Sequence, residues 1–324
     1  IELDYGESRR RFNEQSIIFS NSGRSSDSYS DLWTNVDAVM DTDEDGVSDF
    51  NERILGSDPL DANKFGNHVI EVAFTVGSSV QNSIYGGDNL EATIAHHIAV
   101  TNAAYKDSGV NLEIKNVGVY DVGNDSYGAS TLLDKMQNRT SPFSNLDSTL
   151  DRKPDLFIHF STISGINVGG LAWTNGNNLH GVMNYQTLYE DGNNVGVVAI
   201  DNPAITTAHE LGHNMGLTHS YRQDGPIAFG VSFPWSRGYG VDNNFVTTMG
   251  YTNPFNAPRV SRFSSPDIVC GPDNLPCGIS HENVFVGANA VRTLNIVGPQ
   301  ISVISNGAPP IISAPGEDLI YISN

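Results

Sequence analysis

The chain has 324 residues, which is long enough for one large domain with a filled core and a smaller module. Its 37 acidic and 17 basic side chains give a net charge of -20, which repels nucleic acids and anionic membrane surfaces and favours cation binding. We therefore expect no nucleic-acid partner. No apolar run approaches the roughly 20 residues of a membrane-spanning helix, so membrane insertion is not expected. The chain begins at Ile1 without a basic leader and an apolar segment, as a processed or trimmed chain would.

Two cysteines, Cys270 and Cys277, enclose a short loop that contains two prolines and a glycine. An even cysteine count in an acidic chain rich in Gly and Ser favours an oxidising compartment and a disulfide between these two residues. Two unpaired thiols are the alternative. Neither cysteine has the spacing of a zinc ligand pair. The composition thus favours a secreted protein.

The N-terminal part of the chain is divided into two segments. Residues 1–29 are polar and Ser-rich without a sustained apolar period, and we interpret them as a leader. Residues 30–64 contain an acidic loop with oxygen-bearing groups at positions 1, 3, 5, 7, 9 and 12 and Gly46 at position 6, as in an EF-hand loop. An acidic, solvated linker is the alternative. The predicted calcium ligands are Asp41, Asp43, Asp45, Val47 (through its carbonyl), Asp49 and Glu52.

From residue 69 onward the sequence alternates between strand and helix patterns. Segments rich in β-branched and aromatic residues predict strands over 69–76, 112–122 and 156–161. A helix is predicted to begin with Asp88 as N-cap, supported by Glu91, and to end at Gly109. Shorter helices are predicted over 132–137 and 288–297. This alternation argues for an α/β or α+β fold.

Two short segments flanked by glycine have the character of sheet edges. Gly169–Trp173 and Gly181–Tyr185 are joined by a loop rich in Asn and Gly. An edge strand of this kind could accept a substrate peptide. Near the C-terminus, Asn306–Pro310 is predicted to be a linker. We therefore predict a catalytic domain over 65–305 and, over 306–324, a linker or the start of a further domain.

The stretch around residues 206–220 carries the clearest chemistry. His209 and His213 are four residues apart, so on a helix both imidazoles project from one face and can reach one ion. Gly216 lies where the helix must end, and a left-handed conformation there would bring His219 to the same ion. Three imidazoles leave a position open for water, as in catalytic zinc sites. Histidines that merely cover a helix surface are the alternative.

Glu210 follows the first predicted ligand and is not itself a ligand. Its carboxylate can accept a proton from a water whose pKa zinc lowers towards about 7. Attack of this water on a peptide carbonyl then becomes feasible. The sequence therefore predicts a zinc-dependent hydrolase with Glu210 as general base.

The pattern His-Glu-x-x-His-x-x-Gly-x-x-His resembles the long zinc motif of the metzincin metallopeptidases. In that family a methionine-containing turn follows beneath the metal, and Thr247–Tyr251 lies at a suitable distance after the third histidine. The resemblance implies that Met249 belongs to this turn, with an ordinary core methionine as the alternative. It also implies that Tyr251 steadies the developing oxyanion, as the corresponding tyrosine does in astacin-like and serralysin-like members, with a packed or edge tyrosine as the alternative.

The residue after the third histidine leaves the subfamily open. Ser220 is neither the Glu of astacins, the Pro of serralysins nor the Asp common in adamalysin-like enzymes, and a bacterial reprolysin-like group is preferred. The resemblance implies a metzincin catalytic domain with a mixed twisted sheet, an active-site helix and an irregular C-terminal subdomain. A substrate would bind antiparallel to the edge strand near Gly170–Trp173, with selectivity set by Tyr251–Phe255. We expect a monomeric, secreted bacterial endopeptidase that acts on proteins or peptides.

Two other functions remain open. One is a calcium-stabilised binding module on an inactivated protease scaffold, although such a relative would typically have lost Glu210 or a histidine. The other is a cohesin-type docking function, because residues 41–59 also resemble thrombospondin type-3 or dockerin calcium repeats, but docking requires a second loop. The remaining histidines have no ligand spacing and are predicted to be structural: His68, His96, His97, His159, His180 and His281.

Overall fold

The computed structural model describes residues 42, 68–150, 153–176, 181, 183, 186–226, 229–283 and 285–306. The predicted leader and all six predicted calcium ligands lie outside these residues, as do residues 307–324. From the acidic loop, the exposed Thr42 alone is described. The division of the chain into four segments therefore stays a prediction.

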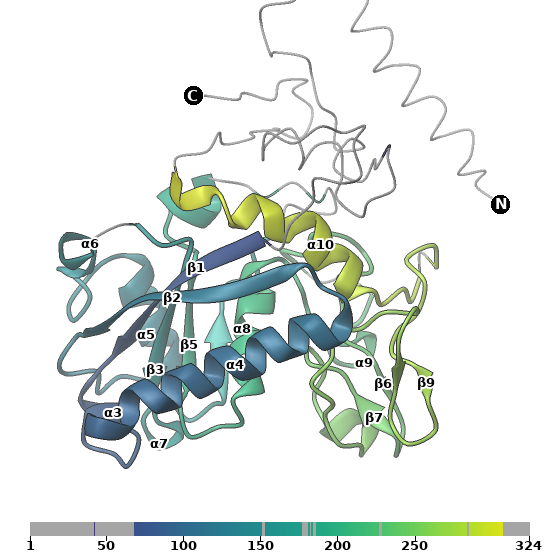
Figure 1. The fold of residues 1–324 in the computed structure, drawn as a ribbon, viewed down its shortest axis with the longest axis horizontal. Coiled ribbons are helices and arrows are strands. Elements are labelled where there is room, and N and C mark those ends of the chain that lie inside the picture. Colours follow the sequence, from purple (N-terminus) through teal and green to yellow (C-terminus); the bar gives the residue numbers. More distant parts are fainter. Residues whose placement is uncertain are drawn as a thin grey trace, which may run out of the picture.

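A five-stranded mixed sheet forms the centre of the described chain, in the order β2-β1-β3-β5-β4 (Figure 1). Its strands are β1 (His68–Val76), β2 (Leu112–Asp121), β3 (Leu156–Ser161), β4 (Gly170–Ala172) and β5 (Val195–Ala199). Neighbouring strands are parallel except that β4 runs antiparallel to β5. The predicted edge strand at residues 169–173 is confirmed, because β4 is the last strand of the sheet on that side.

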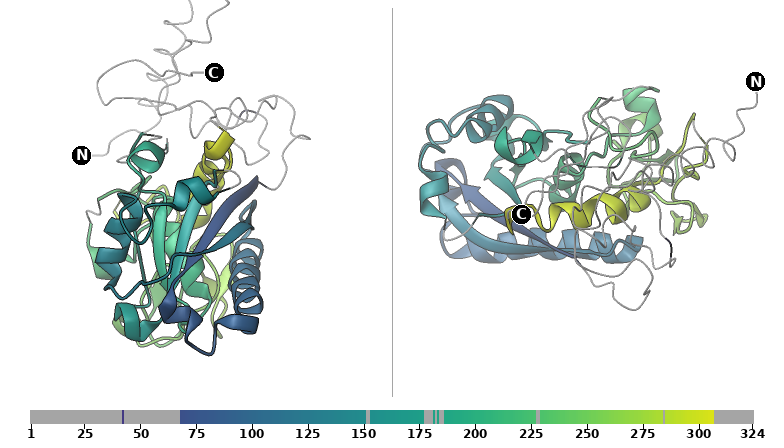
Figure 2. Two further views of the ribbon diagram at one scale, coloured as in Figure 1. Left: turned by 90° about the vertical axis from the view of Figure 1, so that its left-hand side faces the viewer. Right: turned by 90° about the horizontal axis from the view of Figure 1, so that it is seen from above.

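Helices cover both faces of the sheet. The α-helices are α3 (Ser78–Gln81), α4 (Leu90–Ser108), α5 (Ala129–Gln137), α6 (Leu146–Thr149), α7 (Ile163–Ile166), α8 (Ile205–Asn214), α9 (Tyr221–Asp224) and α10 (Ala290–Ile301). Three 3-10 helices, η1 (Gly87–Asn89), η3 (Asn253–Phe255) and η4 (Ile304–Asn306), and one π-helix, η2 (Gln186–Glu190), are also present in the described chain. In the left view of Figure 2, the blue helix α4 lies along one side of the sheet.

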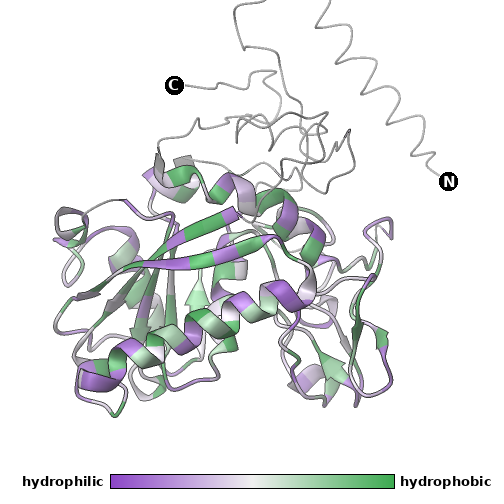
Figure 3. Cartoon of the chain, in the orientation of Figure 1, coloured by the Kyte–Doolittle hydropathy of each residue, from purple (hydrophilic) through white to green (hydrophobic). Residues whose placement is uncertain are grey.

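The two faces are distinguished by alternation along β5. Val195 and Val197 belong to the apolar cluster that contains residues of α5, whereas Val198 belongs to the cluster that contains residues of α4, α8 and α10. Figure 3 shows the apolar colour on the strands and its alternation with polar colour along α4. Because both faces are covered, β3 and β5 are buried along their whole length. The predicted mixed α/β fold is confirmed.

Helix α4 ends as predicted but begins differently. Gly109 adopts a left-handed conformation with a φ of 77° and closes the helix. At the other end, η1 precedes the helix, so Asn89 occupies the N-cap position and no side chain caps it. The predicted cap at Asp88 is wrong, because this residue lies inside the preceding turn.

After α8 the described chain is largely irregular, with two small hairpins. They are formed by β6 (Gly240–Val241) with β7 (Phe245–Val246), and by β8 (Val269–Cys270) with β9 (Leu275–Pro276). Cys270 and Cys277 form the predicted disulfide at the second hairpin. The predicted C-terminal helix is α10, which returns to pack against β1 and β2.

Two strand assignments from the sequence need correction. The interior strand β5 is not predicted, because it has only five residues and Gly196 lowers its strand propensity. The second predicted edge strand, over 181–185, is wrong at Gly181 and Met183, its two described residues. Met183 is fixed instead by its backbone amide, which donates to the Gln300 side chain over 2.9 Å. None of the described helices is long and apolar enough to cross a membrane.

Candidate metal centre

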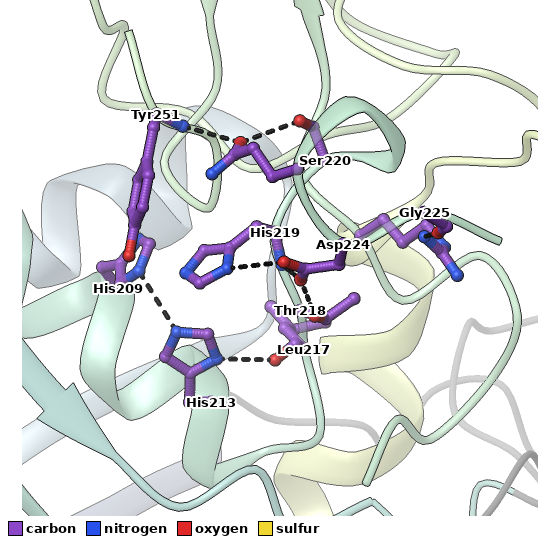
Figure 4. Close-up of polar contacts among 11 residues, drawn as sticks. His209, His213, Leu217, Thr218, His219, Ser220, Asp224, Gly225 and Tyr251 are labelled. Carbon is purple, nitrogen blue, oxygen red and sulfur yellow. Dashed lines mark hydrogen bonds and ion pairs between the residues drawn. The ribbon is translucent and has the colours of Figure 1, made fainter. Parts of the chain in front are cut away.

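Helix α8 presents two imidazoles on one face (Figure 4). The ring centroids of His209 and His213 lie 4.8 Å apart, as the spacing of four residues predicts. All ten residues of this helix are buried, because it packs against β4, β5 and the neighbouring helix α4. The helix therefore holds the two rings in a fixed relation to the sheet.

A glycine turn brings the third imidazole to the same place. Gly216 has a φ of 74°, and a Cβ atom there would lie 2.0 Å from Ser232 Oγ, so both conformation and space favour glycine. The chain then delivers His219, whose ligand atom lies within 4.8 Å of those of His209 and His213. The predicted glycine turn and the convergence of the three histidines are confirmed.

The outer ring nitrogens of all three histidines have hydrogen-bond partners. Nδ1 of His209 donates to the Thr248 carbonyl over 2.9 Å, and Nδ1 of His213 donates to the Leu217 carbonyl over 2.8 Å. Nδ1 of His219 lies 3.2 Å from a carboxylate oxygen of α9, described below. Because a carbonyl can only accept, these bonds place the proton on Nδ1 and leave the Nε2 lone pairs directed to the centre.

The two histidines of α8 are neutral at pH 7. Burial, followed by the charges of the neighbouring imidazoles, holds the pKa of His209 well below its ordinary value. Burial is also the main reason that the pKa of His213 is lowered to about 4. Neutral imidazole is the form that binds metal ions.

The carboxylate beside His219 comes from Asp224, which the sequence analysis missed. Asp224 Oδ1 accepts from the His219 ring, and Oδ2 accepts from the His219 backbone amide over 3.0 Å and from the Thr218 hydroxyl. Helix α9, a single turn, brings this carboxylate back to the ring (Figure 4). The sequence signal would have been a carboxylate one helical turn after Ser220, rather than directly after the third histidine.

Glu210 lies against the edge strand. A Cβ atom at Gly170 of β4 would be 2.3 Å from Glu210 Oε1, so the carboxylate contacts the strand backbone directly. The side chain is buried, and its Oε2 has no hydrogen-bond partner among the described residues. Burial raises the pKa of Glu210 to about 8, against the opposing effect of the Arg259 charge. A bound cation would favour the ionised carboxylate.

Met249 and Tyr251 lie below and beside the three histidines. Met249 is fully buried, and its Sδ lies 2.6 Å from where a Cβ atom of Gly212 would be, directly under α8. The Tyr251 ring centroid lies 4.4 Å from that of His219 and 5.9 Å from that of His209. Its backbone amide donates to Gln223 Oε1 over 2.9 Å, so α9 positions this residue as well.

Comparison with known proteins decides the family. Residues 67–264, more than half of the chain, match the Metallo-peptidase family M12 through a reprolysin-type sequence pattern. The chain belongs to metallopeptidase family M12. This agrees with the reprolysin-like, metzincin resemblance of the sequence.

The M12 chain is also similar to a named enzyme. It is 32% identical over 236 residues to the peptidyl-Asp metalloendopeptidase of Pseudomonas aeruginosa, covering 67% of this chain and 37% of that protein. The M12 chain therefore spans little more than a third of the length of this relative.

Solved structures give a further comparison. A structure titled as a chaperone-substrate complex has a TM-score of 0.56 at 17% identity, over 75% of this chain and 40% of that one, which supports a shared fold. Mature mirolysin of Tannerella forsythia, in complex with a cleaved peptide, covers 75% of this chain and 98% of its own at 16% identity, with a TM-score of 0.41.

Of the histidines predicted to be structural, His97 and His159 are buried, His96 is exposed, and His180 lies outside the described residues. Nε2 of His97 donates to the Ile200 carbonyl, and Nδ1 bonds the Thr207 hydroxyl, which joins α4 to α8. His159 is fully buried in β3. Among the described residues, the three histidines of the centre are the one group of His, Cys, Asp or Glu that could hold a metal ion.

Proposed function

We propose that this M12 member is a zinc-dependent endopeptidase with His209, His213 and His219 as zinc ligands and Glu210 as general base. The observation that carries the proposal is the convergence of three Nε2 atoms whose rings are each held from behind by a hydrogen bond at Nδ1. Such second-layer bonds are typical of histidines that ligate metals. A buried structural cluster would not need all three lone pairs directed to one point.

The site fits zinc on two further grounds. His219 Nε2 and Glu210 Oε2 are both buried and lack a hydrogen-bond partner among the described residues, so a cation would compensate both. Three imidazole ligands with a carboxylate that is not a ligand are typical of catalytic zinc. When bound, zinc supplies a Lewis acid that lowers the pKa of water and polarises the substrate carbonyl.

The residues around the three histidines have separate tasks. Glu210 accepts the proton of the attacking water and delivers it to the leaving amine, since it lies beside the ligands without being one. Burial, with the charges of Glu210 and Asp224, raises the pKa of Tyr251, so its phenol stays protonated and can donate a hydrogen bond to the developing oxyanion. The outer edge of β4 offers backbone groups to an extended peptide.

The substrate and location also belong to the proposal. Because the relative is named a peptidyl-Asp metalloendopeptidase, peptides that contain aspartate are the first substrates to test. The disulfide between Cys270 and Cys277 supports a secreted enzyme. The predicted calcium loop at residues 41–52 would order the approach to the catalytic domain and resist proteolysis, which calorimetric titration of the whole chain with calcium tests.

Zinc content and cleavage of unfolded casein test the proposal in wild type and Glu210→Ala. We expect about one zinc per chain in both proteins, and a fall in casein cleavage of at least roughly hundredfold in the variant. Removal of zinc with a chelator should abolish wild-type cleavage, and zinc should restore it. Metal-loaded wild type that cleaves neither casein nor peptides would instead favour a binding module on this scaffold.

A further inference from the structure

Arg259 lies next to the catalytic residues on the segment that follows η3. Its backbone pairs with Val246, just before the turn that contains Met249. Its Nη2 donates to the carbonyl of Gly250, between Met249 and Tyr251, over 3.0 Å. The guanidinium therefore reaches the stretch of chain beside which the substrate side chain is expected to bind.

The guanidinium of Arg259 has fewer hydrogen-bond partners than those of Arg237 and Arg222. Arg237 donates to three backbone carbonyls, and Arg222 forms an ion pair with Asp242. Among the described residues, the Arg259 side chain makes one hydrogen bond, its buried Nε has no partner, and no carboxylate forms an ion pair with it. A partly buried cation with unpaired donors costs desolvation free energy unless an anion accepts its hydrogen bonds.

The positive charge of Arg259 is directed at the centre. It acts electrostatically on His209, Glu210 and Tyr251, which all belong to the proposed catalytic centre. The side chain stays charged at neutral pH, since guanidinium is not deprotonated in proteins. In a chain with a net charge of -20, a cation at this place is a local exception. Its planar fork of donors matches a carboxylate.

We infer that Arg259 binds the carboxylate of an acidic substrate residue next to the scissile bond and so selects acidic peptides. This inference rests on the proposed peptidase function. The competing role for Arg259 is to hold Glu210 electrostatically, without contact with the substrate. The two roles differ in their consequences: a partner of Glu210 affects all substrates equally, whereas a substrate-binding group affects acidic substrates alone.

The test uses a casein-derived peptide that the wild type cleaves, synthesised with Asp, Asn or Ala on either side of the scissile bond. At the position that contacts Arg259, wild type should have a kcat/KM roughly ten- to hundredfold higher for Asp than for Asn. In Arg259→Gln, the ratio of kcat/KM for Asp to that for Asn should fall to near one. Arg259→Lys should keep part of this preference, because the lysine ammonium retains the positive charge without the guanidinium fork. Raising the salt concentration should lower the wild-type ratio.

The matched control is Arg262→Gln. Arg262 lies three residues further on, and its side chain donates to the Val269 carbonyl of the second hairpin, so loss of this side chain should leave the ratio unchanged. A wild-type ratio near one at both positions, or a ratio that survives Arg259→Gln, would overturn the inference. So would an equal loss of kcat for Asp and Asn peptides in the variant, which identifies Arg259 as a positioning residue for Glu210. Zinc-loaded wild type that cleaves no peptide would instead contradict the proposed function itself.

Discussion

Gly170 of β4 leaves room for the carboxylate that is proposed to act as general base. A methyl group at this position would lie 2.3 Å from Glu210 Oε1 and 2.6 Å from its Cδ, so the carboxylate would have to move. We expect Gly170→Ala to lower kcat roughly hundredfold, because a general base displaced by about 1 Å loses its alignment. Zinc content should not change, since the histidines are untouched. Steady-state kinetics with zinc analysis measures both.

The matched control for this substitution is Gly128→Ala, because a Cβ atom at Gly128 meets no atom within 4 Å. Its kcat should equal that of wild type. Unchanged kcat in Gly170→Ala would mean that the Glu210 carboxylate can move without cost, and that the close contact with β4 does not position it.

Asp224 is expected to set the affinity for zinc by orienting His219. Loss of its charge in Asp224→Asn weakens the bonds to the His219 ring and backbone amide. We expect the dissociation constant for zinc to rise roughly ten- to hundredfold, as is usual for such partners. Competition with a chelator of known affinity measures this. Asp242→Asn is the control, because Asp242 pairs with Arg222 on the surface, and an equal effect in both variants would contradict the assignment.

At the scale of residues, the sequence was sufficient to predict the position of a side chain where spacing along the chain alone determines the geometry. Four residues along a helix fix His209 and His213, and a glycine that must turn the chain fixes the place of His219. Asp224 and Arg259 could not be predicted in this way. Asp224 depends on the single turn of α9, and Arg259 depends on how the segment after η3 folds back beside Met249. Such contacts are tertiary, and no local pattern encodes them.

At the scale of elements, His97 joins α4 to the start of α8. Burial is the main reason that the pKa of His97 is lowered to about 4, so the ring is neutral near pH 7. It forms hydrogen bonds with both the Ile200 carbonyl and the Thr207 hydroxyl. We expect His97→Ala to lower the free energy of unfolding by about 2–4 kcal/mol, because it leaves a cavity and two unpaired polar groups. Urea unfolding of the metal-free proteins measures this.

The neighbouring His96 is a matched control for His97, because it lies on the exposed face of the same helix. His96→Ala should change the free energy of unfolding by less than about 0.5 kcal/mol. Equal effects of the two substitutions would mean that helix propensity, and not the link to α8, determines the loss.

The errors at the scale of elements have one physical origin. Strands β1, β2 and β3 were predicted from segments rich in β-branched and aromatic residues, whereas β5 has only five residues, one of them Gly196, and is formed by tertiary packing. The close packing of the adjacent strands favours glycine at this position. A Cβ atom at Gly196 would lie 3.0 Å from Ile158 of β3 and 3.3 Å from Ala172 of β4. The predicted cap at Asp88 failed for a similar reason, since local capping rules do not anticipate the preceding 3-10 turn.

At the scale of the whole molecule, Asp125 joins three segments that are distant in sequence. It lies between β2 and α5 and accepts hydrogen bonds from the Ser79 amide over 2.9 Å and from the Ser78 and Ser79 hydroxyls at α3. Its Oδ2 is also 3.5 Å from Nε2 of His159 in β3. Burial alone would raise the pKa of Asp125, but the proximity of His159 and the hydrogen bonds from Ser79 outweigh it and hold the pKa at about 2.

A carboxyl whose pKa is lower in the folded than in the unfolded protein stabilises the fold above the unfolded value, near 4, and this contribution disappears as the pH falls towards 2. A shift from 3.8 to about 2 corresponds to about 2–3 kcal/mol. At pH 6, the free energy of unfolding of metal-free wild type should therefore exceed that of metal-free Asp125→Asn by at least this amount. The difference between the two free energies should shrink steadily between pH 4 and pH 2. Urea unfolding across this range measures it, with Asp134→Asn, on the exposed face of α5, as the control that changes little. A difference that stays constant with pH would show that Asp125 acts through hydrogen-bond geometry and not through its charge.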